Sequence, residues 1–151
     1  MKYLQKGFII PIIIAIVALL IIGDLTYFYK KSEVMDLSIY IQDKSYVATS
    51  SCSVTKEVIY KVPKTTAVAD TSLKILFNDE LSTYGVYESV SIVNGVAKVM
   101  LVSNMTSAGT SVSSLSSCES SHLSSVLEDT LTQYSSIKSV ELWSPQGLIQ
   151  F

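Results

Sequence analysis

The chain has 151 residues, enough for one domain of ordinary size and an appendage. Its residues are 48% hydrophobic, with a mean hydropathy of +0.40 and a net charge of −2. Because such a chain has no basic field to neutralise phosphates, nucleic acid is excluded as an electrostatic partner.

An apolar run near the N-terminus predicts a membrane anchor. The run, from Phe8 to Ile22, contains no polar side chain, and the aromatic cluster at residues 27–29 extends it towards the length of about 20 residues that a spanning helix needs. It is followed by neither a small-residue cleavage site nor a cysteine for lipid attachment. We therefore expect an uncleaved, single-pass anchor in the cell membrane, with residues 1–35 as anchor and linker and residues 36–151 as the domain.

The charges that flank this run bear on its orientation. Lys2, Lys6 and the amino terminus precede it, whereas Lys30 and Lys31 after it are partly offset by Asp24. Because the cytoplasmic flank of an anchor carries the excess of lysine, this distribution favours a domain on the extracytoplasmic side.

One alternative rests on Lys6-Gly7-Phe8, which resembles the processing site of type IV prepilins. Those leaders carry Glu at the fifth mature position, where this chain has Ile12. A pilin would also continue its helix well past the membrane, whereas a strand pattern begins here at Leu37. A pilin-like subunit stays an alternative.

The first part of the domain predicts two strands and a helix. Residues 37–41 alternate apolar and polar side chains, as a half-buried strand does, and residues 57–62 predict a second strand. Residues 68–77 carry apolar side chains at helical spacing, and Thr65 and Thr66 are candidate N-caps.

The next segment predicts a β-hairpin. Residues 88–93 and 96–102 are strand-like and flank Asn94-Gly95, the pair that best tolerates the positive φ angles of a type I′ turn. Counting outwards from the turn predicts a register in which apolar pairs and polar pairs fall on opposite faces. The predicted pairs are Val93–Val96, Ile92–Ala97, Ser91–Lys98 and Val90–Val99.

The last part of the domain predicts a loop, a helix and a strand. Small residues at 104–114 form the loop, residues 115–134 form the helix, and residues 139–143 alternate as a strand closed by residues 145–147. The expected buried face of the helix consists of Leu115, Cys118, His122, Val126, Leu127, Thr130, Leu131 and Tyr134. The resulting order, β-β-α-β-β-α-β, predicts an α+β two-layer sandwich in which one sheet carries two helices on one face.

Three segments, in this order, make the domain similar to the GerMN domain family, the sporulation and spore germination domain. They are KVPKTTAVADTSLKILFND, SVSIVNGVAKVMLVS and LEDTLTQYSSIKSVELW. The resemblance extends over nearly all of residues 37–151 and departs from the family between Leu81 and Glu88, where the family has a longer loop with a proline. It implies a module of bacterial envelope proteins that has no established catalytic residues and that takes part in protein–protein assembly.

The two cysteines, Cys52 and Cys118, predict a disulfide between the loop at residues 43–55 and the start of the second helix. Such a bond is expected only outside the cytoplasm. Three alternatives use the same residues: free buried thiols, a zinc site with His122, and a nucleophilic dyad of Cys118 and His122. Zinc wants four ligands, usually in tight pairs, and a dyad needs a third orienting group. We therefore expect no metal at these residues.

Other motifs that carry chemistry are lacking. The serines form no nucleophile elbow, the six glycines form no phosphate-binding loop, and the acidic pairs Asp79-Glu80 and Glu128-Asp129 are expected to be solvated helix ends. Trp143 with Tyr87 is the candidate for a ligand platform, against the alternative that both pack within the sheet. We expect no catalytic residue and no cofactor.

These observations predict a membrane-tethered, extracytoplasmic module that binds an envelope protein or assembles with itself and is not an enzyme. The alternatives are an accessory of a cell-wall enzyme and a pilin-like subunit.

Overall fold

The computed structural model of the protein describes residues 33–45 and 52–150. The chain divides into two compact units after Glu33, and the second unit, from Val34 onwards, contains every helix and strand described below. Within the described residues no helix is long and apolar enough to cross a membrane. The predicted anchor, including Phe8–Ile22, lies outside them.

The domain is of the α+β class, as the sequence predicts, but its strands form two sheets rather than one. The first is a hairpin of β1 (Val34–Gln42) and β2 (Thr55–Pro63). The second has four strands in the order β3-β4-β5-β6. The expectation of a single sheet is therefore wrong, because the pattern of a half-buried strand does not say which sheet the strand joins.

The four-stranded sheet is mixed. Its strands are β3 (Tyr87–Val93), β4 (Val96–Leu101), β5 (Ser139–Ser144) and β6 (Gly147–Ile149). β4 and β5 run parallel, so the chain between them crosses over through a helix, whereas the other neighbours are antiparallel. β6 was not predicted, because a strand of three residues after a turn is too short for a recognisable alternation.

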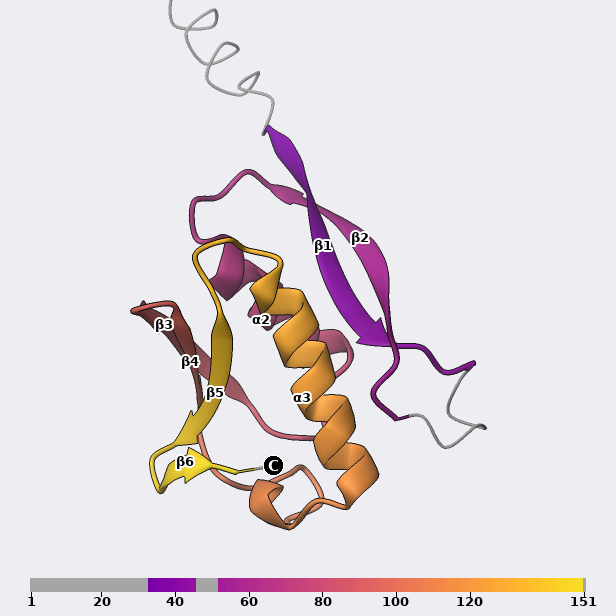
Figure 1. Ribbon diagram of the computed structural model, residues 1–151, viewed down its shortest axis with the longest axis vertical. Coiled ribbons are helices and arrows are strands. Elements are labelled where there is room, and N and C mark those ends of the chain that lie inside the picture. The colour runs from indigo at the N-terminus through magenta and orange to yellow at the C-terminus, as the bar shows by residue number, and fades with distance from the viewer. Residues whose placement is uncertain (1–32, 46–51, 151) are drawn as a thin grey trace, which may run out of the picture. The chain divides into compact units, whose positions relative to one another are not determined.

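Two helices lie between the two sheets (Figure 1). They are α2 (Val68–Asp79) and α3 (Ser117–Thr132), and both contact β1 on one side and the four-stranded sheet on the other. The domain thus has three layers, hairpin, helices and sheet, instead of the expected two. Each layer contributes to one core. Its fully buried side chains include Ile39, Leu73, Leu76, Leu123, Leu127, Val99 and Leu142.

The hairpin of β3 and β4 confirms the predicted register. Val93 pairs with Val96 and Ser91 with Lys98, and the turn residues Asn94 and Gly95 have φ angles of 53° and 84°. The predicted sorting of the faces needs a correction. The apolar pair Val93–Val96 shares the outer face with Ser91 and Lys98, because these pairs are two residues apart along each strand.

The helix ends differ from expectation. Neither Thr65 nor Thr66 caps α2, whose N-cap is Ala67 without a side-chain hydrogen bond, and the hydroxyl of Thr65 instead accepts a bond from the Ala67 N–H. α3 begins in a capping box in which Ser116 and Glu119 satisfy each other's backbone N–H groups. A short 3₁₀ helix, η2 (Val112–Ser114), lies in the predicted loop before α3.

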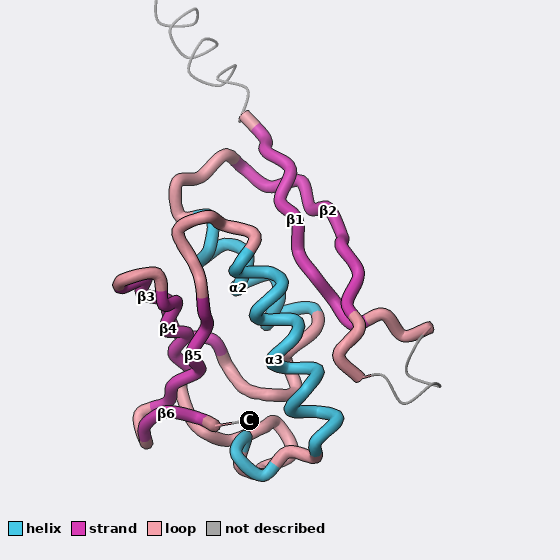
Figure 2. Tube along the Cα trace, in the orientation of Figure 1, coloured by secondary structure: helices cyan, strands magenta, loops and turns pink. Residues whose placement is uncertain are grey.

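Helix α3 closes the free edge of β1. The hydroxyl of Thr130 accepts a hydrogen bond from the Tyr40 N–H at 3.0 Å and also contacts the Tyr40 carbonyl, at 3.3 Å. The amide of Gln133 donates to the Ser38 carbonyl at 2.8 Å. Figure 2 shows β1 running alongside α3, with β2 on the far side of the hairpin. A two-stranded hairpin is marginal by itself, so these bonds help to hold it on the domain.

Candidate interaction surface

The strand register arranges the outer face of the four-stranded sheet, which points away from the helices, in three rows across the strands. An apolar row contains Met100, Trp143 and Leu148 and begins at Ser89 on β3. Next to it is a charged row, and beyond that a third row that is mainly valine. The charged row is Ser91, Lys98 and Glu141, and the third row is Val93, Val96 and Ser139.

The opposite face of the same strands is the core. Ala97, Val99 and Leu101 of β4 and Leu142 of β5 are fully buried there against the helices. On the outer face, by contrast, Val93 is 52% exposed and Leu148 is 47% exposed. Among the described residues no helix or strand covers this face, and Figure 1 shows both helices on the other side of the sheet. We call these three rows the open face.

On the open face, Trp143 contacts two polar neighbours that orient its ring. Its indole N–H donates to a carboxylate oxygen of Glu141 at 2.9 Å, and the Lys98 ammonium lies 5.1 Å from the ring centroid, a cation–π distance. The Lys98 ammonium nitrogen and a carboxylate oxygen of Glu141 are 3.9 Å apart, and the two side chains are 43% and 37% exposed. An exposed ion pair of this kind adds little to stability, so it orients the ring more than it strengthens the fold.

Beside this ring the open face is hollowed. A depression of about 170 Å³ is lined by Trp143, Met100, Lys98 and the two serines of β3, Ser89 and Ser91. Trp and Met are residues that concentrate binding energy at protein interfaces, because both offer large apolar surfaces and Met adapts its shape. The open face therefore has the composition of a contact surface: apolar side chains around one neutralised charge pair.

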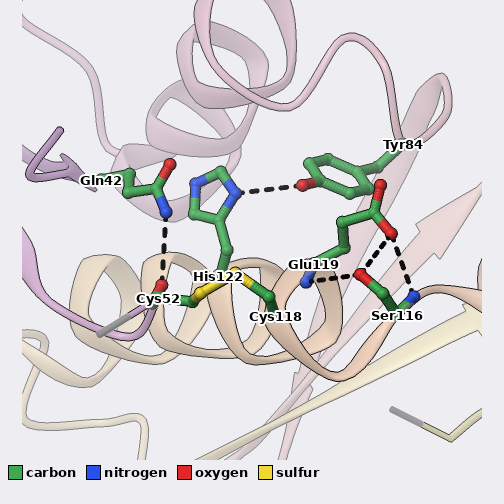
Figure 3. Close-up of a disulfide and its surroundings, with 7 residues drawn as sticks. All are labelled: Gln42, Cys52, Tyr84, Ser116, Cys118, Glu119 and His122. Carbon is green, nitrogen blue, oxygen red and sulfur yellow. Dashed lines mark hydrogen bonds between the residues drawn. A yellow bond between two sulfur atoms is a disulfide. The ribbon is translucent and has the colours of Figure 1, made fainter. Parts of the chain in front are cut away.

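The structure also brings the two cysteines together. The Cα atoms of Cys52 and Cys118 are 5.3 Å apart and their sulfurs are at disulfide distance, which meets the geometric condition of the predicted disulfide. Figure 3 shows the bond crossing from the β1–β2 loop to the first turn of α3, and the amide of Gln42 reaching the Cys52 carbonyl. Paired sulfurs cannot serve as zinc ligands or as a nucleophile.

His122 lies one turn further along α3 and is buried at the edge of the core. Its Nδ1 is 3.0 Å from the Tyr84 hydroxyl, and its Nε2 is 3.4 Å from a carboxylate oxygen of Glu80, without a well-aligned hydrogen bond. Burial lowers the pKa of His122 below its ordinary value, and Glu80 opposes this only in part. Glu80, expected to be solvated, is instead turned inwards with 14% of its side chain exposed.

The residues around His122 form a small buried polar cluster. Within residues 33–45 and 52–150, no three His, Cys, Asp or Glu side chains lie close enough to hold a metal ion. The Tyr84 hydroxyl and the Glu80 carboxylate are the polar groups at the two ring nitrogens, and all three side chains are largely buried, which leaves little room for a substrate beside them. The arrangement suits a structural role beside the disulfide.

The predicted pair of platform residues is not brought together. Trp143 lies on the open face, whereas Tyr87 faces the core, where its ring stacks on Phe77 with centroids 5.7 Å apart. Its hydroxyl donates to Asp70 at 2.7 Å, and burial raises its pKa. A signal for the open face was present in the sequence, because the alternation of β4 and β5 separates Lys98, Met100, Glu141 and Trp143 from the core residues.

The chain matches no protein-family model, and no curated protein or solved structure is significantly similar to it. The resemblance to the GerMN family thus stays a prediction.

Proposed function

We propose that the protein is a non-catalytic, GerMN-like interaction module, tethered to the cell membrane on its extracytoplasmic side, that binds a protein of the cell envelope through the open face. Three features support this proposal. The apolar run Phe8–Ile22 supports the tether, the cysteine pair supports the compartment, and the open face supports the binding role.

The compartment is supported by chemistry. Cys52 and Cys118 are the only cysteines of the chain, and the structure places them at disulfide distance. Disulfides persist in oxidising compartments and are rare in the cytosol, so this pair fits a domain outside the cytoplasm.

The single observation that carries the binding role is the open face. Met100, Trp143 and Leu148 form one apolar row and Val93 and Val96 belong to another, on the two sides of the Lys98–Glu141 pair, and no described helix or strand covers them. Exposed apolar side chains gathered on one face mark an interaction site.

Location is tested with the full chain expressed in bacterial cells. Protease added to intact spheroplasts should remove the domain while a cytoplasmic control protein survives, and the remaining N-terminal fragment should stay with the membrane after alkaline extraction. A domain that is degraded only after lysis would contradict the extracytoplasmic placement. Intact mass of the full chain is measured as well, since a mature form beginning at Phe8 would favour the pilin-like alternative.

Binding is tested in the same cells with a photo-crosslinking amino acid at Met100, matched by one at Lys56 on β2. Both positions lie on strands, but Lys56 is exposed outside the open face. We expect a discrete covalent product from position 100 and none of the same mass from position 56. Identical products from both positions would contradict a role for the open face, and a cell-wall enzyme in the specific product would favour the accessory alternative.

A further inference from the structure

The charged row of the open face is self-complementary. Lys98 and Glu141 occupy paired positions on the adjacent, parallel strands β4 and β5. Consider a two-fold axis that lies above the face, parallel to these strands and midway between them. Rotation about it places β4 of one copy over β5 of the other, with paired residues at the same position along the axis. Each Lys98 therefore meets the Glu141 of the second copy.

We propose that the open face binds the open face of a second copy of this chain, with the two-fold axis running between β4 and β5. This inference rests on the proposed function, because it names the partner of the same surface. Two-fold homodimers are the commonest closed assemblies, and their interfaces must be self-complementary in this sense. Sheets that pack face to face also keep their strands within about 30° of each other, which such an axis allows.

The same axis matches the apolar residues. Met100 and Trp143 are register partners on β4 and β5, so the Met100 of one copy lies over the Trp143 of the other. Leu148 of β6 then faces the β3 edge of the second copy, beside Ser89. Apolar side chains thus flank a central ring of two lysines and two glutamates whose charges sum to zero. A partner of strong positive or negative charge would gain nothing from this neutral face.

The size of the face indicates how such a dimer forms. Four strands about 4.8 Å apart and six residues of about 3.3 Å each give a patch of roughly 20 by 20 Å, or about 400 Å². A stable complex buries about 800 Å² per partner, so this contact is weak for molecules free in solution. Two copies tethered to one membrane are confined to a thin layer, and this confinement raises their local concentration without any new contact.

The proposed axis is compatible with a common tether. A two-fold rotation does not change the position of an atom along the rotation axis. Both copies therefore have the start of β1 at the same end of the dimer. Figure 1 shows that β1 begins at the end of the domain where the chain passes from α3 to β5, which is one end of the sheet strands. Both chains therefore enter from one side, as two anchors in one membrane require.

The test exchanges charges between copies. Full-length chains carrying fluorophores at the N-terminus are reconstituted in liposomes at equal surface density, and association is measured by energy transfer above the level of random collisions. K98E places carboxylates opposite carboxylates, and E141K places ammonium groups opposite ammonium groups. Each variant alone should therefore lose association by about tenfold or more.

The decisive sample is the mixture of K98E and E141K chains. Every facing pair in the mixed dimer is again of opposite charge, so association should return to within about threefold of wild type. Recovery in the mixture separates the proposed contact from damage to the Trp143 environment, since each substitution also removes one neighbour of that ring and mixing cannot restore it. K56E is the matched charge reversal on β2 and should leave energy transfer unchanged.

The energy-transfer and crosslinking results together distinguish self-association from binding to another envelope protein. Wild-type energy transfer at the collision level, or a mixture no better than the two variants while the cysteine pair stays oxidised, overturns the self-assembly. If the crosslinker at Met100 nevertheless captures a different envelope protein, the proposed function stands without it. If neither energy transfer nor a specific crosslink is found, both fail.

Discussion

The β1–β2 hairpin and the β3–β6 sheet pack against the same two helices, yet they are held in different ways. The hairpin has two strands, and bonds from α3 close the edge of β1 at Tyr40 and Ser38, while the disulfide fixes its loop. The sheet has four strands, a parallel crossover and a tight turn, and no helix or strand of the described residues covers its outer face. The four-stranded sheet packs its core on one face, so its other face is available for binding. The hairpin, in contrast, depends on contacts from α3 and the disulfide.

The largest expected effect comes from removing the disulfide. Closing a loop with a sequence separation of 66 residues contributes about 4 kcal/mol in the chain-entropy model, so the C52S/C118S double variant should lose about that much free energy of unfolding in denaturant titration. Hydrogen exchange distinguishes the two sheets, because the amides of β1 and β2 should lose more protection than the amides of β4 and β5. Equal losses in both sheets would show that the hairpin does not depend on the bond.

The second effect tests the core side of the four-stranded sheet. Leu142→Ala removes a fully buried side chain from β5 and should cost about 3 kcal/mol, because the cavity is only partly filled by its neighbours. Met100→Ala, on the open face of the neighbouring strand, is the matched control and should cost less than about 1 kcal/mol. A control as costly as Leu142→Ala would mean that the two faces are not distinct.

How much of this contrast the sequence predicts depends on the kind of signal. The turn of the β3–β4 hairpin and the register of the pairs next to it are predicted correctly, because Asn94-Gly95 fixes the turn and the turn fixes the register. The outer ends are not, since the register shifts between Tyr87 and Ser89 and β4 ends at Leu101. The placement of β1 and β2 in a separate sheet is not predictable, since alternation in residues 37–41 records a buried face and not the neighbour that buries it. The open face is predictable only in part. Its residues on β3, β4 and β5 lie on strands that the sequence predicts, whereas Leu148 lies on the unpredicted β6, and only the structure shows that no described element lies over the rows.

The third effect concerns the bonds by which α3 closes β1. Thr130→Val keeps the shape of the side chain but removes the hydroxyl that bonds to the backbone of Tyr40, so it should cost about 1 to 2 kcal/mol. Thr132→Val is the control, because the Thr132 hydroxyl is exposed and donates only within its own helix, to the Glu128 carbonyl. A Thr130 variant as stable as this control would show that the edge of β1 does not need α3.

The smallest expected effect is a dependence of the free energy of unfolding on pH, caused by His122. The folded pKa of His122 is lowered, mainly by burial, so the folded domain resists protonation more than the unfolded chain does. The free energy of unfolding should therefore fall as the pH drops below about 6.5, the unfolded value, and this contribution should level off once the pH is below the folded pKa. His122→Gln should flatten the decline in that range in denaturant titrations. Glu80→Gln should steepen it, because Glu80 now favours the charged ring. If the fall in unfolding free energy with pH is the same in His122→Gln as in the wild type, protonation of carboxylates, not of His122, causes it.

The position of the disulfide also governs how the domain would respond to a mechanical load. Force on a tethered chain enters at Val34, where β1 pairs with Pro63 at the end of β2, so a pull separates the hairpin from this end and breaks its backbone bonds in succession. Bonds broken one after another yield at low force. Extension would then stop at Cys52, because its covalent link transfers the load to the first turn of α3. The hairpin would act as a short extensible segment with a fixed limit between the tether and the core of the domain.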